Sequence, residues 1–376
     1  MAGIYIHIPF CKKKCTYCDF HTVVAPNQIP NVISAITKEL EIRKEYLKDE
    51  IVKTIYFGGG TPSILSKDDF ELIFATIYHL FKIDTQAEIT FEANPDDLSI
   101  EYLRTINSLP FNRISIGIQS FNDDELERIN RRHTGEQAIE AVQNAQKMGF
   151  KNISIDLIYG LPLQTLDGWE QQIAIALKLN IQHISAYGLT FEQGTPLWKQ
   201  REKGLVKTVE DDNMNSMHSI LIETLEENGF EAYEISNFAK VGYRSQHNSA
   251  YWKLEPYLGL GPSAHSFDGK SRQWNISSNT KYITAITKGE AFYEIEELTT
   301  NERYNDYVMI SLRTSDGINL QVLEQLFGAE MTDYCLKNIK QFINTKKVEI
   351  TNNSLKLTKE GIQISNIIIT QIIKIE

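Results

Sequence analysis

The stretch GIYIHIPFCKKKCTYCDF, residues 3–20, carries the most distinctive pattern in this chain. Its first part, Gly3 to Ile8, places an isoleucine at every second position, which predicts a β-strand with one buried face. Directly afterwards come Cys11, Cys15 and Cys18, three of only four cysteines among 376 residues. The chain therefore gathers its thiols on one short loop at the end of a strand.

Three thiolates with this spacing can bind three irons of a 4Fe–4S cluster and leave the fourth iron without a protein ligand. A disulfide is disfavoured, because three closely spaced thiols cannot pair off and the chain shows no apolar signal peptide. The remaining alternative is a zinc site of the Cys3His type, completed by His21. The cluster is the stronger interpretation, and its open iron would be the place where a small molecule binds and reacts.

Six β-strands are expected in the first 230 residues, each followed by a turn and an amphipathic helical stretch. The expected strands are residues 4–8, 54–57, 87–92, 113–119, 152–157 and 183–189, and the clearest helices are 66–81, 136–148 and 211–228. Such alternation predicts a parallel sheet. Six units are too few to close an eight-stranded barrel, so we expect an open partial (β/α)6 barrel of the TIM type.

Ligands of parallel α/β folds lie at the carboxyl ends of the strands. Residues that could bind a ligand recur at these strand ends. They are the cysteines after the first strand, Gly58-Gly59-Gly60 after the second, and then Glu92, Gln119, Asp156 and Tyr187 on the next four. This shared register predicts a binding site at one end of the barrel. Taken singly, a glycine triplet is often only a tight turn, and a lone acidic residue is often part of an ion pair or a helix cap.

We divide the chain into residues 1–230 as the core, 231–298 as a connecting region and 299–376 as a C-terminal domain. The last part reads as three helices, a hairpin around Asn352-Asn353 and a final helix, an α+β pattern similar to a winged helix. A net charge of −11 argues against a nucleic-acid partner. No apolar stretch is long enough to span a membrane, although contact of the apolar segment 362–375 with a membrane surface stays open. Reduced thiols and no export signal favour the cytoplasm.

The segment YIHIPFCKKKCTYCDF, together with GGGTP at residues 58–62, resembles the opening of radical S-adenosylmethionine (SAM) proteins. In detail it is similar to the branch that contains oxygen-independent coproporphyrinogen III oxidase. The resemblance implies a 4Fe–4S cluster on Cys11, Cys15 and Cys18, with SAM chelating the open iron. The protein would then mainly supply binding, orientation and exclusion of water.

The same resemblance assigns the SAM contacts to ten further residues. Gly59, Gly60 and Thr61 would touch SAM, and Tyr5 and Tyr17 would flank the cluster and the cofactor. Glu92 in TFEANP, Gln119 in GIQSFN, Arg131 in INRRHT, Asp156 in SIDLIYGLP and Gly188 complete the set. A carboxylate can accept hydrogen bonds from ribose hydroxyls, and an arginine can pair with the cofactor carboxylate.

A second distinctive string, QHNSAYW, spans residues 246–252. Here His247 could ligate haem iron, and Tyr251 and Trp252 could offer apolar faces to a porphyrin. The alternative is a core histidine whose ring is hydrogen-bonded to a backbone carbonyl. The string matches H-N-x-x-Y-W, which resembles the signature of the HemW-type haem chaperones, relatives of the oxidase.

Two departures separate the chain from the oxidase pattern. Phe20 stands where the oxidase has an additional cysteine, and the cysteine loop begins at Cys11, without a long preceding extension. We therefore expect a haem chaperone that binds a cluster, SAM and haem and passes haem to an apoprotein, with a respiratory enzyme as the family expectation. The alternatives are an oxidative decarboxylase of coproporphyrinogen III and a radical SAM methyltransferase.

Overall fold

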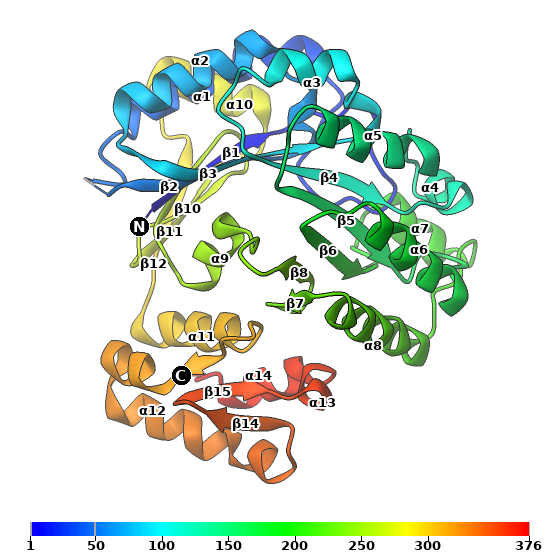
Figure 1. Ribbon diagram of the computed structural model, residues 1–376. Coiled ribbons are helices and arrows are strands. Elements are labelled where there is room, and N and C mark those ends of the chain that lie inside the picture. Colours follow the sequence, from blue (N-terminus) through cyan, green and yellow to red (C-terminus); the bar gives the residue numbers. More distant parts are fainter. Residues whose placement is uncertain (1, 49, 376) are drawn as a thin grey trace.

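The computed structural model of the protein describes residues 2–48 and 50–375. Its main element is a mixed sheet of 12 strands that curves into an open arch, as Figure 1 shows. The strands follow the order β12-β11-β10-β9-β1-β2-β3-β4-β5-β6-β8-β7. The six strands from β1 to β6 pair in parallel and in chain order, so the expected open (β/α)6 barrel is confirmed.

The six parallel strands lie close to the predicted positions. They are β1 (Ala2–Ile8), β2 (Val52–Gly59), β3 (Ile83–Ala93), β4 (Arg113–Gln119), β5 (Ile153–Tyr159) and β6 (His183–Gly188). Alternate side chains point outward and are fully buried beneath helices; Phe57, for example, contacts Phe70 and Phe74 with ring centroids 5.3 and 5.2 Å apart. Burial of each large apolar side chain contributes about 1.5–3 kcal/mol, so the outer face holds the barrel together.

Helices cover the outer face of the arch. They are α1 (Ile29–Ile42), α2 (Lys67–Leu80), α3 (Ile100–Ile106), α4 (Asp123–Arg128), α5 (Gly135–Lys147), α6 (Leu166–Lys178), α7 (Pro196–Glu202) and α8 (Asp211–Glu227), with the short 3₁₀ helices η1 (Pro26–Gln28), η2 (Pro62–Ile64) and η3 (Pro95–Asp97). Ser66 and Asp69 form a capping box at the start of α2, and Thr134 and Gln137 form one at α5. Since a capping box satisfies free N–H groups, these helices begin where their sequences predict.

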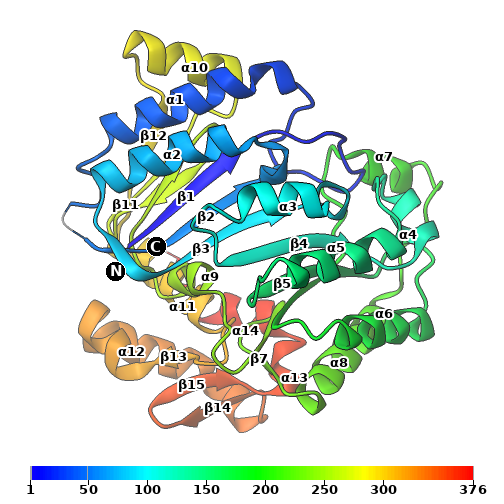
Figure 2. The same cartoon turned by 45° about the horizontal axis from the view of Figure 1, so that its top comes forward.

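Residues 231–298, which we expected to connect two domains, contribute strands to both edges of the sheet. Beside β6 lie β8 (Asn237–Lys240) and β7 (Phe230–Ala232), both antiparallel; beside β1 lie β9 (Tyr257–Leu260), which is parallel, and then β10 (His265–Phe267), β11 (Ser271–Asn275) and β12 (Tyr293–Glu297). Between these strands, α9 (Gln246–Trp252) lies on the concave side of the arch, and α10 (Asn279–Lys288) packs against α1 on the outside (Figure 2).

The C-terminal part forms a second core below the arch. Its elements are α11 (Thr300–Ser311), β13 (Ile318–Asn319), α12 (Leu320–Asn344), β14 (Val348–Thr351), β15 (Ser354–Leu357), α13 (Lys359–Ile362) and α14 (Ser365–Ile372). The strands form a small sheet in the order β13-β15-β14, and the turn between β14 and β15 places Asn352 and Asn353 at φ values of 48° and 63°. The expected hairpin is therefore present. Gly328 interrupts α12, and two helices close the chain where we expected one.

In the described residues, no helix combines the length and the apolar character that crossing a membrane requires.

Candidate functional site

The cysteine loop lies at the carboxyl ends of the parallel strands. Cys11, Cys15 and Cys18 are partly exposed free thiols. The loop is anchored by backbone hydrogen bonds, from the N–H of Cys11 to the carbonyl of Val23 at 3.1 Å and from the N–H of Thr16 to the carbonyl of Ile129 at 3.1 Å. Burial raises the pKa of Cys11 and raises that of Cys18 to about 11. Without a metal the environment therefore favours thiols over thiolates, and a bound cation would have to supply the compensating charge.

The three thiols fit a cluster better than a single ion. Within residues 2–48 and 50–375, no three His, Cys, Asp or Glu side chains converge closely enough to hold one metal ion. In a 4Fe–4S cluster each cysteine binds a different iron, so spread thiols are compatible with it. The ring of His21, the fourth ligand in the zinc alternative, instead lies 3.3 Å from Asn279 Oδ1.

The glycines after β2 let the cysteine loop approach this strand closely. A Cβ on Gly60 would lie 2.5 Å from the carbonyl oxygen of Phe10, and one on Gly59, which has φ +103°, would lie 2.5 Å from the ring of His7. The Gly60 N–H donates to the carbonyl of Ile8 at 2.8 Å. The triplet therefore sets the position of the first cysteine, while the N–H groups of Gly59 and Gly60 donate within the protein, to Glu92 and to Ile8.

Two half-buried carboxyl groups face the inside of the barrel. Glu92 accepts hydrogen bonds from the Tyr56 hydroxyl at 2.8 Å and from the Gly59 N–H at 3.2 Å, while Asp156 accepts one from Ser115 at 3.3 Å. Burial raises the pKa of Glu92 to about 7, with Asp156 adding to the effect, and burial raises the pKa of Asp156 to about 6 against the attraction of Arg113. Near neutral pH the two groups thus sit close to the point of gaining a proton.

At the mouth of the barrel, the end where the carboxyl ends of the strands meet the cysteine loop, two buried polar atoms have no hydrogen-bond partner among the described residues. They are Oε1 of Gln119 and Nε of Arg131. Gln119 ends β4 with φ +70°, a conformation that a non-glycine residue rarely adopts. A buried acceptor and a buried donor without partners are costly unless a ligand satisfies them. Their chemistry fits a polar cofactor such as SAM.

The other expected SAM contacts line the same mouth. The hydroxyl of Tyr5 on β1 lies 3.1 Å from His7 Nδ1, and Tyr17 in the cysteine loop packs beside Ile158 and Leu161. Burial raises the pKa of both tyrosines, so their hydroxyls remain protonated. Gly188 ends β6, and a Cβ there would lie 3.0 Å from Met214 Cε and 3.2 Å from the ring of Tyr159.

Asn94 joins the site although the sequence patterns did not single it out. The Thr61 hydroxyl donates to Cys11 Sγ at 3.4 Å and Arg131 Nη1 donates to Cys15 Sγ at 3.5 Å. Between them, Asn94 Nδ2 donates to Thr61 Oγ1 at 3.2 Å, and Asn94 Oδ1 accepts from Arg131 Nη2 at 2.8 Å. The string EANP, which drew attention through Glu92, contains this residue two positions later.

His247 lies near the opposite end of the strands. Its Nδ1 lies 2.8 Å from Thr54 Oγ1, its Nε2 lies 2.8 Å from the Tyr251 hydroxyl, and its ring stacks on that of Tyr56 at 4.9 Å. The side chain is buried, and desolvation lowers its pKa to about 3, so the imidazole is neutral. Both ring nitrogens therefore have partners in this conformation, and both partners are hydroxyl groups.

Glu88, which the sequence did not single out, holds the start of α9 in place. The buried carboxylate of Glu88 accepts the N–H groups of Gln246 and His247, each at 3.1 Å, and so satisfies the start of the helix. Since His247 lies against Gly3 and the cysteines follow Ile8, the two places are separated by five residues of β1, about 16 Å. Tyr56 connects them, because its ring touches His247 and its hydroxyl binds Glu92.

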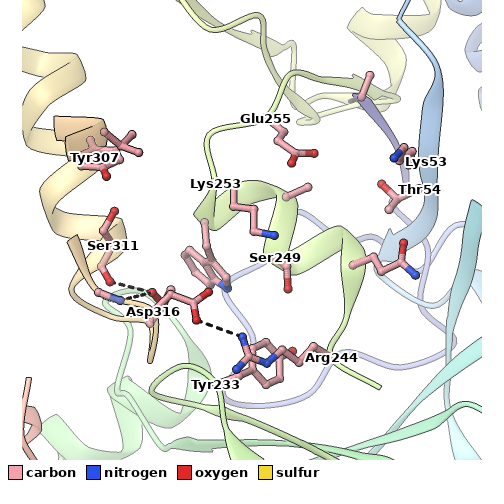
Figure 3. Close-up of a pocket in the computed structure, with 17 residues that line it drawn as sticks. Lys53, Thr54, Tyr233, Arg244, Ser249, Lys253, Glu255, Tyr307, Ser311 and Asp316 are labelled. Carbon is pink, nitrogen blue, oxygen red and sulfur yellow. Dashed lines mark hydrogen bonds and ion pairs between the residues drawn. The ribbon is translucent and has the colours of Figure 1, made fainter. Parts of the chain in front are cut away.

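A cavity of about 500 Å³ lies between α9 and the C-terminal domain (Figure 3). Trp252 lines it together with Tyr233 and Tyr307, so aromatic faces come from three parts of the chain. Trp252 Nε1 is buried and has no acceptor within residues 2–48 and 50–375. Arg244 reaches across to Asp316 at 3.5 Å, whereas no ion-pair partner for Lys53 or Lys253 occurs in the described part of the chain.

Comparisons with known proteins give the relationships of the chain. Residues 5–173 match the family described as the Radical SAM superfamily, and residues 298–364 match the HemN C-terminal domain. The chain is 34% identical over 371 residues to the heme chaperone HemW of Bacillus subtilis (strain 168), covering 97% of each chain. It is 33% identical over 362 residues to the heme chaperone HemW of Lactococcus lactis subsp. lactis (strain IL1403), covering 96% of this chain and 94% of that one.

A solved structure shows the same fold. The coproporphyrinogen III oxidase (HemN) from Escherichia coli, described as a radical SAM enzyme, superposes with a TM-score of 0.86 at 22% identity, covering 99% of this chain and 90% of that chain. The superfamily match implies a 4Fe–4S cluster and SAM, in agreement with the loop of Cys11, Cys15 and Cys18. Similarity over nearly the whole length at more than 30% identity establishes that the chain belongs to the HemW family within the radical SAM superfamily.

Proposed function

We propose that the protein is a haem chaperone, which binds haem reversibly and passes it to an apoprotein, with respiratory enzymes as the expected recipients. Kinship with proteins named heme chaperone HemW supports this function. The observation that carries it is the cavity of about 500 Å³ along α9, because Trp252 of the H-N-x-x-Y-W string forms part of its wall. Ligand sites in proteins typically measure about 300–1,000 Å³.

The lining of the cavity suits a flat macrocycle with two carboxylates. Trp252, Tyr233 and Tyr307 offer aromatic surface to the ring system. Lys53 and Lys253 border the same space and can pair with propionate groups. The free indole N–H of Trp252 can donate a further hydrogen bond. We infer that haem lies between α9 and the C-terminal domain.

We propose that His247 ligates the haem iron. Its neutral imidazole is the form that binds iron, and its low pKa keeps that form present across the physiological pH range. Thr54, which holds Nδ1, also lines the cavity. To bind iron the ring must leave Thr54 and Tyr251 and turn towards the cavity. Two neutral hydrogen bonds are worth about 1–3 kcal/mol together, a loss that a coordinate bond to iron can offset.

We further propose that Cys11, Cys15 and Cys18 hold the 4Fe–4S cluster. The SAM contacts would come from the mouth of the barrel: Tyr5, Tyr17, Gly59, Gly60, Thr61, Glu92, Gln119, Arg131, Asp156 and Gly188. The unpartnered atoms of Gln119 and Arg131 support this assignment. When bound, the cluster would supply one-electron chemistry at SAM, and the protein side chains would hold and orient the cofactor.

Haem titration of the anaerobically reconstituted protein tests the chaperone proposal. We expect a saturable Soret band at about one haem per chain, the stoichiometry of a single iron ligand. His247→Ala should weaken binding and shift the band. Tyr251→Phe frees Nε2 and should strengthen or accelerate binding, while His79→Ala, an exposed histidine on α2, should change nothing.

Two results would speak against these proposals. If the unaltered protein binds no haem saturably, the chaperone function is wrong, and SAM cleavage in the presence of coproporphyrinogen III becomes the next assay. If haem binds but His247→Ala and Tyr251→Phe behave like the His79 control, only the ligand assignment is wrong. Replacing Ala250 in the cavity wall by tryptophan should then still block binding, if the cavity is the site.

A further inference from the structure

Asn94 lies between the two side chains that donate hydrogen bonds to cysteines of the loop. Five residues form one continuous path, which runs Cys11, Thr61, Asn94, Arg131, Cys15. The three residues between the cysteines come from separate parts of the chain: Thr61 follows β2, Asn94 follows β3 and Arg131 follows α4. The path therefore ties separate parts of the mouth to two of the three thiols.

The chemistry of the groups fixes the direction of every hydrogen bond in this path. A guanidinium only donates, so the side-chain oxygen of Asn94 must face Arg131, and its NH2 group must face Thr61. A threonine hydroxyl has a single hydrogen. Because Thr61 accepts from Asn94, that hydrogen is left for Cys11 Sγ. One amide thus orients donors towards two sulfur atoms.

The position of Asn94 is itself fixed by the backbone. Its N–H donates to Ser63 Oγ at 3.3 Å, and Ser63 Oγ donates to Asp97 Oδ2 at 2.9 Å. Asp97 also forms an ion pair with Lys12 of the cysteine loop. Arg131 is held from the other side, because its Nη2 also donates to the carbonyl of Gly117. The amide therefore cannot turn without breaking several contacts.

We propose that Asn94 is a positioning residue that sets the reduction potential of the cluster by orienting Thr61 and Arg131 towards Cys11 and Cys15. Hydrogen bonds to cysteine sulfurs stabilise the reduced cluster, which carries one more negative charge, and so raise its potential. The inference rests on the cluster assignment in the proposed function and deepens it. Neither SAM nor haem is needed for this effect.

A double-mutant cycle on the SAM-free protein tests the inference. The variants are Asn94→Asp, Thr61→Val and their combination, each titrated with dithionite and redox dyes while the cluster is followed by electron paramagnetic resonance. The carboxylate introduced by Asn94→Asp can still accept from Arg131 but cannot donate, so the Thr61 hydroxyl would turn to it and leave Cys11. We expect a lower potential in Asn94→Asp and in Thr61→Val.

The double variant, Asn94→Asp with Thr61→Val, decides whether Asn94 acts through Thr61. In the Thr61→Val background, Asn94→Asp should lower the potential by less than it does in the unaltered protein, because only the added charge remains. Thr61→Ser keeps the hydroxyl and should restore a potential close to the original. Equal shifts in both backgrounds, or no shift in Thr61→Val, would overturn the role of Asn94.

Iron and sulfide analysis separates this result from a failure of the cluster assignment. If the unaltered protein holds no cluster on the three cysteines, the proposed function is at fault. If the cluster is intact in every variant and its potential does not move, only the inference about Asn94 is wrong. Should Asn94→Asp lose the cluster, the pair Thr61→Val and Thr61→Ser still tests the hydrogen bond to Cys11.

Discussion

At the mouth of the barrel, the buried atoms Gln119 Oε1 and Arg131 Nε have no partners in the part of the chain that the structure describes, whereas near the other end of the strands His247 has a partner for each ring nitrogen. The two regions also differ in the groups that surround these atoms. The mouth is built from backbone N–H groups, carboxyl groups and thiols, and the region of α9 from stacked aromatic rings and hydroxyls. A ligand at the mouth would complete hydrogen bonds, while iron at His247 would have to break them.

This difference bears on how the two proposed ligands would be held. A site with unsatisfied buried groups favours a bound cofactor, because each orphaned group costs about 1–3 kcal/mol without its partner. His247 is satisfied when the site is empty, so the bond to iron is offset by lost hydrogen bonds and haem leaves more readily, although haem can also accept a hydrogen bond from Trp252 Nε1. Permanent binding at the mouth and transient binding beside α9 are what a haem carrier with a resident cofactor requires.

Cysteine substitution should have the largest effect on the mouth. Cys15→Ser is expected to abolish the cluster, because three irons would keep only two thiolate ligands. Iron and sulfide content and the brown colour of the purified protein report this loss. Cys335→Ser, which alters a buried cysteine of the C-terminal domain, is the control and should leave the cluster unchanged. A Cys15→Ser protein with full iron content would show that the cluster lies elsewhere.

Gly60→Ala should disturb the mouth through packing alone. The new methyl group would lie 2.5 Å from the carbonyl oxygen of Phe10 and 2.7 Å from that of Ile8, so the cysteine loop has to move. Overpacking of this kind costs about 1–3 kcal/mol. We expect a lower midpoint in denaturant unfolding and partial loss of iron. Gly168→Ala, in helix α6, has only the Thr165 hydroxyl nearby and should stay close to the original in both measurements.

The α9 region can be tested with two buried threonines on neighbouring strands. Thr54→Val removes the hydroxyl that binds His247 Nδ1 and leaves a buried nitrogen unpaired, which should destabilise the fold by about 1–3 kcal/mol. Thr90→Val removes a buried hydroxyl for which the described residues offer no partner, and it should be neutral or stabilising. Denaturant unfolding of both variants measures the contrast. Equal stability changes would mean that the satisfied network around His247 contributes nothing.

The sequence predicted the mouth far better than the region of α9. Residues of the mouth follow long, regular strands, so their common position at one end of the sheet could be inferred from the alternation of strands and helices. The sequence did not predict Asn94 as a site residue, because its role comes from contacts with Thr61 and Arg131, which are 33 and 37 residues away in the chain. No local pattern reports such a contact.

The sequence did not predict the strands β7 to β12, for a different reason. They have three to five residues each, and β12 (YEIEE) is exposed along its whole length. Such short strands are placed by pairing with their neighbours, β9 with β1, β8 with β6 and the others with these in turn, rather than by their own periodicity. The partners of His247 were equally hidden. The sequence offered a backbone carbonyl as the alternative partner, and the structure has the hydroxyls of Thr54 and Tyr251.

The smallest expected effects are opposite pH dependences at the two ends of the barrel. The pKa of His247 falls from 6.5 to about 3 on folding, so between these values the unfolded chain binds the proton and stability rises with pH. The pKa of Glu92 rises from 4.5 to about 7, so between these values the folded chain holds the proton and stability falls as pH rises. From pH 5 to 6.5 the two contributions oppose each other.

Glutamine substitutions separate these contributions. His247→Gln should remove a positive slope of stability against pH, and Glu92→Gln a negative one, each at most about 1.4 kcal/mol per pH unit. Anaerobic denaturant unfolding at several pH values between 5 and 6.5 measures the slopes, with His79→Gln on the exposed face of α2 as the control. If both profiles run parallel to that of the control, neither side chain is as strongly desolvated as its burial indicates. If only Glu92→Gln differs, water reaches His247 and the region of α9 is more open than its hydrogen bonds imply.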